Sequence, residues 1–213
     1  TRTYVAPFER RDRAADYAAV LERFAGLADL FTVNVSSPNT ERLRDLQGRD
    51  ALEALLAGVL ATRDRAAPGA PVLVKLSPDL DAAGLEAAVG ACLDKGADGI
   101  VATNTTLSRD GLRSRHAAEA GGLSGAPLRD RAQATLAAVA RQTRGRLTLV
   151  GVGGIATPED AYARIRAGAR LLQLYTAMIW QGPSLPARLA EGLDALLARD
   201  GVRRLEEVVG ADL

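Results

Sequence analysis

Short apolar runs, five or six residues long, recur at five places along the chain. They show no regular polar alternation, which is typical of strands covered on both faces in a parallel sheet. Polar and glycine residues follow each run. The pattern therefore predicts five parallel strands, at residues 30–35, 72–76, 99–103, 147–152 and 171–175.

Between these runs, apolar residues recur three and four positions apart, which is the spacing of an amphipathic helix. The clearest sets are Tyr17, Val20, Leu21 and Phe24, then Leu52, Leu55, Leu56, Val59 and Leu60, and then Leu185, Leu189, Leu193 and Leu196. We expect a helix over each set, the last of them at residues 184–198.

Two of the predicted helices carry signals for their ends. Asp50 with Glu53 three residues later fits a capping box, in which side chains bond to the free N–H groups of the first turn. Thr157 before Pro158 predicts a helix that begins there, and Gly168 stands where that helix should end.

The alternation of helices and strands predicts a parallel α/β fold without a second domain. A closed (β/α)8 barrel usually needs about 250 residues, and the 213-residue chain opens on Thr1 rather than on methionine. We therefore expect residues 1–213 to be one domain of the TIM (β/α)8-barrel family, truncated at the N-terminus to a partial barrel of about five βα units. An open, doubly wound sheet is the alternative.

Composition narrows the classes of partner. The chain is 47% hydrophobic and 25% charged, and its formal net charge is +1, so we expect no attraction to nucleic acid or to an acidic membrane surface. No apolar run approaches the roughly 18 residues of a membrane span, and no signal peptide is recognisable. The single cysteine, Cys92, excludes an internal disulfide and fits a reducing cytosol.

Small polar residues and glycines stand at the carboxyl end of every predicted strand. In both candidate geometries ligands bind at this edge of the sheet. A purely structural sheet has no need of amides and hydroxyls at all five ends. The sequence therefore predicts a functional rim at residues 34–40, 75–79, 103–106, 151–155 and 175–177.

Glycine-rich turns at this rim predict a phosphate site. Gly153 and Gly154 lead into the helix that begins at Thr157, Tyr175 and Thr176 follow the final strand, and residues 121–125 form a third turn, rich in glycine. Glycines let backbone N–H groups approach an anion closely, and the last two loops of such barrels commonly bind phosphate. One such turn is weak evidence because tight turns use glycine for steric reasons alone, but three converging turns favour a phosphorylated ligand.

Three single residues need interpretation. Lys75 near a strand end fits a charge beside an electron-rich cofactor, a Schiff-base lysine, or, least well at the rim, a surface lysine. His116, the one histidine, lies in an arginine-rich stretch, where a loop role is more plausible than catalysis. Cys92 falls on a predicted helix, where an inert buried thiol is expected. One histidine and one cysteine supply neither a His-based triad nor a Cys/His zinc site, so no metal is expected.

Six segments resemble signature segments of the class 2 dihydroorotate dehydrogenases, in the order and spacing of that family. The similarity runs from about residue 14 to residue 199. Six segments in register are more specific than any one motif. The segments are residues 34–40, 74–80, 102–106, 121–128, 150–155 and 173–176.

The resemblance implies an FMN enzyme that oxidises dihydroorotate to orotate in pyrimidine (UMP) biosynthesis, with quinone as the electron acceptor. It also implies peripheral attachment to the cytoplasmic side of a bacterial cell membrane, through an N-terminal segment that this chain does not include. Membrane association is therefore an expectation from the family and not from these residues.

The resemblance also implies roles for individual residues. Ser37 is the implied catalytic base, which removes a proton from carbon 5 of dihydroorotate; class 1 enzymes carry cysteine at this place. A serine hydroxyl is a weak base and needs a proton relay and a dry pocket. The implied substrate residues are Asn34, Asn39, Asn104 and Thr105. The implied FMN residues are Asn34, Lys75 and Thr103, with Gly125, Gly154, Tyr175 and Thr176 at the phosphate.

The chain departs from the family pattern at two places. Glu41 and Arg42 stand where family members usually have Pro-Gly, which predicts altered hinge behaviour of the active-site lid. The first strands of the family barrel, which supply further FMN and substrate contacts, have no counterpart here. Another FMN barrel that acts on a pyrimidine ring, a Schiff-base aldolase on Lys75 and a non-catalytic phosphate-binding barrel are the alternatives.

Overall fold

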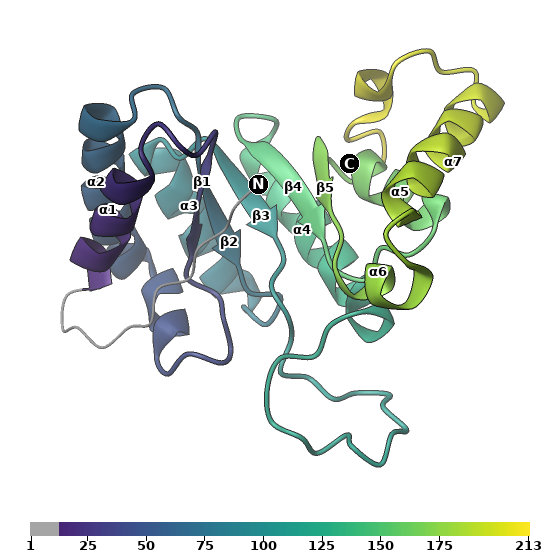
Figure 1. Ribbon diagram of the computed structural model, residues 1–213, viewed down its shortest axis with the longest axis horizontal. Helices are drawn as coiled ribbons and strands as arrows, with labels where there is room; N and C mark the ends of the chain where they lie inside the picture. The colour runs from purple at the N-terminus through teal and green to yellow at the C-terminus, as the bar shows by residue number, and fades with distance from the viewer. Residues whose placement is uncertain (1–12) are drawn as a thin grey trace.

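The computed structural model describes residues 13–213 and is built around one parallel sheet (Figure 1). Its five strands lie side by side in the order β1-β2-β3-β4-β5. All five predicted strands are present, with small differences at their ends. Their bounds are β1 (Phe31–Asn34), β2 (Val72–Leu76), β3 (Gly99–Ala102), β4 (Thr148–Val152) and β5 (Leu171–Gln173).

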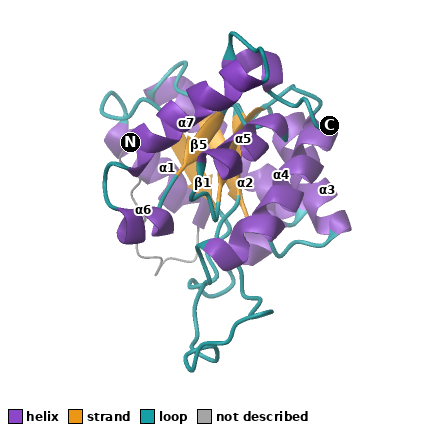
Figure 2. Ribbon diagram, turned by 90° about the vertical axis from the view of Figure 1, so that its right-hand side faces the viewer, coloured by secondary structure: helices purple, strands orange, loops and turns teal. Residues whose placement is uncertain are grey.

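Helices separate the strands along the chain (Figure 2). No helix within residues 13–213 is both long and apolar enough to cross a membrane. The α-helices are α1 (Arg13–Phe24), α2 (Arg49–Ala66), α3 (Ala82–Lys95), α4 (Arg129–Thr143), α5 (Pro158–Arg166), α6 (Thr176–Gln181) and α7 (Leu185–Arg199). Short 3-10 helices are η1 (Leu43–Gln47), η2 (Ala126–Leu128) and η3 (Leu205–Val208).

Helices α1 to α5 pack against one face of the sheet, and α7 packs on α5. Val74 and Ile100 point to that side and join the main hydrophobic core, together with residues of α1 to α4. The alternate residues Leu73, Val101 and Val150 form a separate small cluster on the opposite face. A doubly wound sheet has helices on both faces, so that alternative is wrong. In a (β/α)8 barrel the strands are paired in sequential order and the helices cover only the outer face of the sheet. This arrangement is present here, and the prediction of a partial barrel is confirmed.

Three strands end earlier than the apolar pattern predicts, and the first of them, β1, ends at Asn34 instead of residue 35. β3 ends at Ala102, so that Thr103 belongs to the rim. β5 ends at Gln173, because Tyr175 has φ −145° and ψ −83° and α6 begins at the next residue. The apolar run continues past the end of pairing, because its last residues pack around α6 instead of joining the sheet. Leu174, for example, packs in the cluster that contains Met178 of α6.

The helix-end predictions have different outcomes. The capping box at Asp50 is wrong, because α2 begins at Arg49 after an extended Gly48 that provides no side-chain cap. Glu53 instead forms an ion pair with Arg49 (2.9 Å). Thr157 does cap α5, and its reciprocal partner is Asp160, which accepts from the Thr157 N–H at 3.0 Å.

Candidate functional site

The ends of β1 and β3 meet in a cluster of amide and hydroxyl side chains. The Asn104 Nδ2 donates hydrogen bonds to the Asn34 Oδ1 (3.1 Å) and to the Ser36 Oγ (3.1 Å). The Ser36 hydroxyl donates to the Asn34 Oδ1 (3.0 Å), and the Thr105 N–H donates to the Asn104 Oδ1 (2.8 Å). The structure thus brings together three of the four predicted substrate residues. It adds the buried Ser36, which the sequence pattern does not distinguish from its neighbour.

Ser37 and Asn39 lie on the loop that follows β1. The Ser37 Oγ accepts a hydrogen bond from the Asn39 N–H (3.3 Å). Ser37 is half-buried and Asn39 is exposed. Across from this loop, Gly122 has no room for a Cβ, which would lie 2.9 Å from the Pro38 Cγ and against the Thr105 side chain. Glycine at position 122 therefore allows the two loops to approach each other closely.

Lys75 lies on the inner face of the sheet, in register with Asn34 on one side and with Val101 on the other. Burial lowers the pKa of its ammonium below the ordinary value, because the charged form loses its water. Since burial is the cause of this shift, an electron-rich ligand beside Lys75 would favour the charged form again.

A cavity of about 610 Å³ opens at the carboxyl ends of the strands. Ligand pockets commonly measure roughly 300–1,000 Å³. Asn104 and Thr105 line this cavity, whereas Ser37 and Asn39 lie outside its lining. Its lining also includes every predicted cofactor residue except Asn34, namely Lys75, Thr103, Gly125, Gly154, Tyr175 and Thr176.

Glycine-containing loops converge at one end of this cavity, as expected for a phosphate site. Gly154 has φ +71°, and a Cβ there would meet the Arg129 backbone N at 2.8 Å and its Cα at 2.6 Å. Glycine at position 154 therefore allows this loop to approach the start of α4 closely. Gly125 packs against Thr176, whose hydroxyl donates to the Ser124 Oγ (2.8 Å). The resulting backbone cradle fits a phosphate-bearing cofactor.

Arg164 of α5 supports this cradle from behind and is missed by sequence reasoning. Its side chain is 1% exposed and donates hydrogen bonds to the Gly153 O (2.6 Å), to the Arg129 O (2.7 Å) and to Gln133. Burial lowers the pKa of Arg164 to about 10. In an arginine-rich chain, the helical spacing alone does not separate this buried arginine from Arg166, which is paired with Asp212 near the surface.

The remaining candidates behave as the sequence suggests or stay outside the site. Cys92 is fully buried in α3, and burial raises the pKa of its thiol to about 12, which fits an inert cysteine. His116 lies exposed in the long loop before α4, with its Nδ1 2.6 Å from the Glu119 Oε1. Residues 13–213 contain no group of three or more His, Cys, Asp and Glu side chains that is placed to bind a metal ion.

Arg42, at the position where the family resemblance implies glycine, has a left-handed backbone conformation. Arg42 has φ +54°, and it precedes η1. Its Nε lies 3.0 Å from the Asp45 Oδ2 in an exposed ion pair. Side chains disfavour this left-handed region by about 1–2 kcal/mol, so the departure from Pro-Gly costs conformational energy at the end of the Ser37 loop.

Comparisons with known proteins agree with this geometry. The sequence pattern of the family described as dihydroorotate dehydrogenase matches residues 5–197. Dihydroorotate dehydrogenase (quinone) from Cereibacter sphaeroides (strain KD131 / KCTC 12085) is 60% identical over 199 residues, which are 93% of this chain and 56% of the relative. The protein of the same name from Deinococcus deserti is 52% identical over 206 residues, 94% of this chain and 57% of the relative. A crystal structure of DHODH from Eimeria tenella in complex with ferulenol has a TM-score of 0.92 at 31% identity, and covers 96% of this chain and 59% of that chain.

A partial parallel barrel with a glycine-lined cavity at its carboxyl rim defines a protein of the (β/α)8-barrel class. Within that class, the chain belongs to the dihydroorotate dehydrogenase family. It spans 56–57% of the length of these two curated relatives.

Proposed function

We propose that the complete protein containing this chain uses FMN to oxidise dihydroorotate to orotate, in pyrimidine biosynthesis. The observation that carries the proposal is the continuity of two sites. The amide cluster of Asn34 and Asn104 adjoins the glycine-lined cavity, and Asn104 belongs to both. Relatives that are 50–60% identical bear the name of this activity, which supports the same assignment.

In this proposal the cavity holds FMN. The phosphate would bind in the backbone cradle of Gly125, Gly154, Tyr175 and Thr176, and Lys75, Thr103 and Asn34 would contact the flavin ring. When bound, FMN would accept the hydride from carbon 6 of dihydroorotate. Lys75 would then provide positive charge beside an electron-rich ring, in a pocket where water screens that charge little. Burial lowers the pKa of Lys75, and negative charge on a neighbouring ring would raise this pKa again by favouring the ammonium form.

The substrate would bind at the amide cluster. Asn34, Asn39, Asn104 and Thr105 offer both donors and acceptors, which suits the ring amides and the carboxylate of dihydroorotate. Asn34 and Asn104 already orient each other, so their free lone pairs and N–H groups keep fixed directions. Fixed directions favour a rigid ring with matching groups over a flexible acid.

Ser37 would take the proton from carbon 5 of the substrate. Its Oγ accepts the Asn39 N–H at 3.3 Å, and a donor at this place favours negative charge on the oxygen. A hydroxyl needs this support because its own proton must pass to a relay, a neighbouring threonine or a water molecule, as the substrate proton arrives. The half-buried position of Ser37 lets substrate binding exclude water from the reacting atoms.

Quinone is the proposed electron acceptor, by analogy with the relatives, which are named dihydroorotate dehydrogenase (quinone). Peripheral attachment to the cytoplasmic side of the bacterial membrane belongs to the same proposal. The electron acceptor can be tested separately from the oxidation of dihydroorotate. After dihydroorotate has reduced the flavin and has been removed, reoxidation of the flavin by added quinone can be followed.

The test is an anaerobic titration of the complete protein. We expect the absorbance spectrum of a bound flavin, and bleaching of the flavin bands when dihydroorotate is added. Bleaching by dihydrouracil or a dihydrouridine instead would indicate a different pyrimidine-ring oxidoreductase. Absence of flavin from a folded protein that still binds inorganic phosphate would contradict the proposal and favour a non-catalytic barrel.

A further inference from the structure

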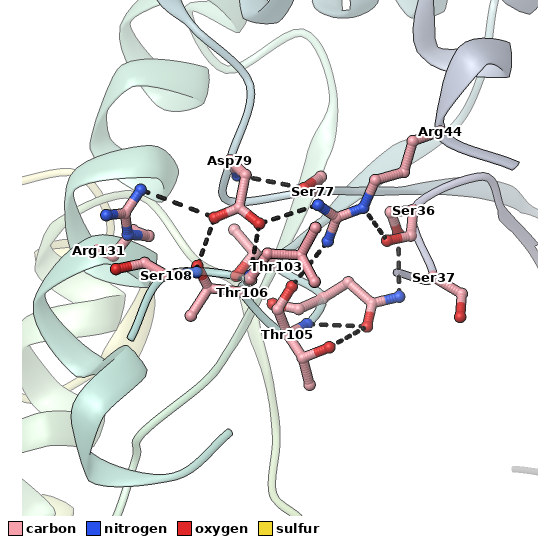
Figure 3. Close-up of polar contacts among 12 residues, drawn as sticks. Ser36, Ser37, Arg44, Ser77, Asp79, Thr103, Thr105, Thr106, Ser108 and Arg131 are labelled. Atoms are coloured by element: carbon pink, nitrogen blue, oxygen red, sulfur yellow. Dashed lines mark hydrogen bonds and ion pairs between the residues drawn. The ribbon is translucent and has the colours of Figure 1, made fainter. Parts of the chain in front are cut away.

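The guanidinium of Arg44 joins three loops of the rim (Figure 3). Arg44 lies on η1. Its Nε donates to the Ser36 O (3.1 Å), its Nη1 to the Asp79 Oδ2 (2.9 Å) and its Nη2 to the Thr105 O (3.0 Å). These three acceptors follow β1, β2 and β3 respectively. One side chain therefore cross-links three consecutive strand ends.

Asp79 fixes this guanidinium in place. Its carboxylate also accepts hydrogen bonds from the Leu107 N–H (2.9 Å) and from the Thr106 hydroxyl. The side chains of Arg44 and Asp79 are 21% and 19% exposed, so water competes little for their contact. Burial raises the pKa of Asp79, but the bonds from Thr106, Leu107 and Arg44 outweigh burial, so its pKa lies below the ordinary value. Asp79 is therefore ionised at neutral pH and holds the guanidinium in a fixed geometry.

The hydrogen bond from Arg44 to the Ser36 carbonyl fixes the backbone of the loop after β1, which carries Ser37. That carbonyl shares one planar peptide with the Ser37 N–H, so fixing it fixes the orientation at which the chain enters Ser37. The bond to the Thr105 carbonyl acts on the segment that carries Asn104. The hydrogen bond that the Ser37 side chain itself makes is the local one with Asn39.

We propose that Arg44, held by Asp79, is a positioning residue that sets the distance between Ser37 and the Asn104–Thr105 segment. The inference rests on the proposed function and deepens it. It assigns to Arg44 the positioning of the proposed base, Ser37, relative to the substrate, although the Arg44 side chain would contact neither of them. A lysine at position 44 could reach Asp79 as a point charge but could not span three diverging acceptors.

The test compares Arg44→Lys with Arg131→Lys in the complete protein. Arg131 is the matched control, because its Nη1 lies 3.6 Å from the Asp79 Oδ1 and it reaches neither Ser36 nor Thr105. We expect Arg44→Lys to slow flavin reduction roughly 10–100-fold, the scale for misplacing a reacting group by about 1 Å. Flavin content should be unchanged, since the cradle lies on other loops. Arg131→Lys should reduce its flavin at the unmodified rate.

Isotope effects distinguish positioning from a loss of structure. With dihydroorotate deuterated at carbon 5, Arg44→Lys should show a larger isotope effect on flavin reduction than the unmodified protein, because proton transfer becomes more limiting. Backbone hydrogen exchange should accelerate at residues 36–39 and 104–107 and stay unchanged at residues 153–157. An unmodified reduction rate in Arg44→Lys overturns the inference. A slower rate with an unchanged carbon 5 isotope effect also overturns it, as does slowing that merely parallels lost flavin.

Failure of the proposed function has a different signature. In that case dihydroorotate would not reduce the flavin of the unmodified protein, and the hydrogen-exchange comparison would still report whether Arg44 orders both loops. Exchange at residues 36–39 and 104–107 that is equal in Arg44→Lys and in the unmodified protein refutes the positioning role, independently of any activity.

Discussion

Arg164 donates a 2.6 Å hydrogen bond to the carbonyl oxygen of Gly153, directly beneath the loop proposed to hold the cofactor phosphate. The same guanidinium donates to the Arg129 carbonyl at the start of α4. Its Nε has no hydrogen-bond partner among the described residues, although it is buried. The cradle therefore depends on a buried cation that is held chiefly by neutral oxygen atoms.

Replacing that cation should weaken both the fold and the cradle. In Arg164→Leu the Gly153 and Arg129 carbonyl oxygens lose their donors, which costs about 1–3 kcal/mol for each unsatisfied buried group. Urea denaturation of the complete protein should show this loss, together with weaker FMN binding. Arg166→Leu, two residues along the same helix and in a surface pair with Asp212, is the control and should change both quantities much less. Equal losses in the two variants would contradict a special role for Arg164.

Ser37→Ala tests the proposed base. A hydroxyl is removed without added bulk, so FMN and orotate binding should persist, while flavin reduction by dihydroorotate slows roughly 10²–10⁴-fold. Ser37→Cys should recover part of the rate with a shifted pH profile, because a thiolate forms more readily than an alkoxide. Stopped-flow absorbance under anaerobic conditions measures both. Ser114→Ala, in the exposed loop, should behave as the unmodified protein; if Ser37→Ala does too, Ser37 is a structural residue.

Gly154→Ala separates steric demand from backbone strain. The added methyl meets the Arg129 backbone at 2.6 Å, and the residue must also keep φ +71°. Gly145 has φ +75° with nothing within 4 Å of a Cβ, so Gly145→Ala carries the strain alone. We expect Gly145→Ala to cost about 1–2 kcal/mol, and Gly154→Ala to cost more and to lose FMN. Similar unfolding energies and full flavin content in both variants would show that the loop can move away from α4.

The Asp79 carboxylate should stabilise the fold only at pH values at which it is ionised. Its pKa in the folded protein lies below the ordinary value, so its favourable contacts are complete above about pH 4 and are lost as pH falls through the folded pKa. Asp79→Asn should therefore be less stable than the unmodified protein at pH 7, and the difference should shrink below about pH 4. Denaturation at a series of pH values measures this. A difference that is constant down to pH 3 would argue against the ionised Arg44 pair.

The chain of 213 residues by itself should self-associate. Leu171, Ile179 and Trp180 are 54%, 66% and 83% exposed, and β1 and β5 are the edge strands of the sheet. Exposed strand edges beside apolar surface favour association. Light scattering should detect oligomers, and Leu171→Lys should reduce them more than Leu107→Lys on the long loop, where Leu107 is 52% exposed. A monodisperse monomer that unfolds cooperatively and retains flavin would contradict this expectation.

The sequence predicts the sheet well because each strand is a local apolar run. It also predicts that the strand ends share one edge, because the strands are parallel, but residues 34–40 at that edge lie outside the lining of the cavity. It does not predict the roles of Arg44 and Arg164, because both depend on carbonyl oxygens contributed by distant loops. The capping box at Asp50 fails for a related reason: the conformation of Gly48, and not the side-chain pattern, decides where α2 begins.

The order of the strands also determines how this part of the protein can be made. Each strand pairs with the strand that precedes it in the chain, so every new βα unit finds its partner already synthesised. Contacts between units that are close in sequence favour fast folding, and chains generally fold from the N-terminus during synthesis. Within β1 to β5, no strand has to wait for a later one to insert between it and its neighbour. The newly made edge is thus exposed only for the time that the ribosome needs to add one more unit.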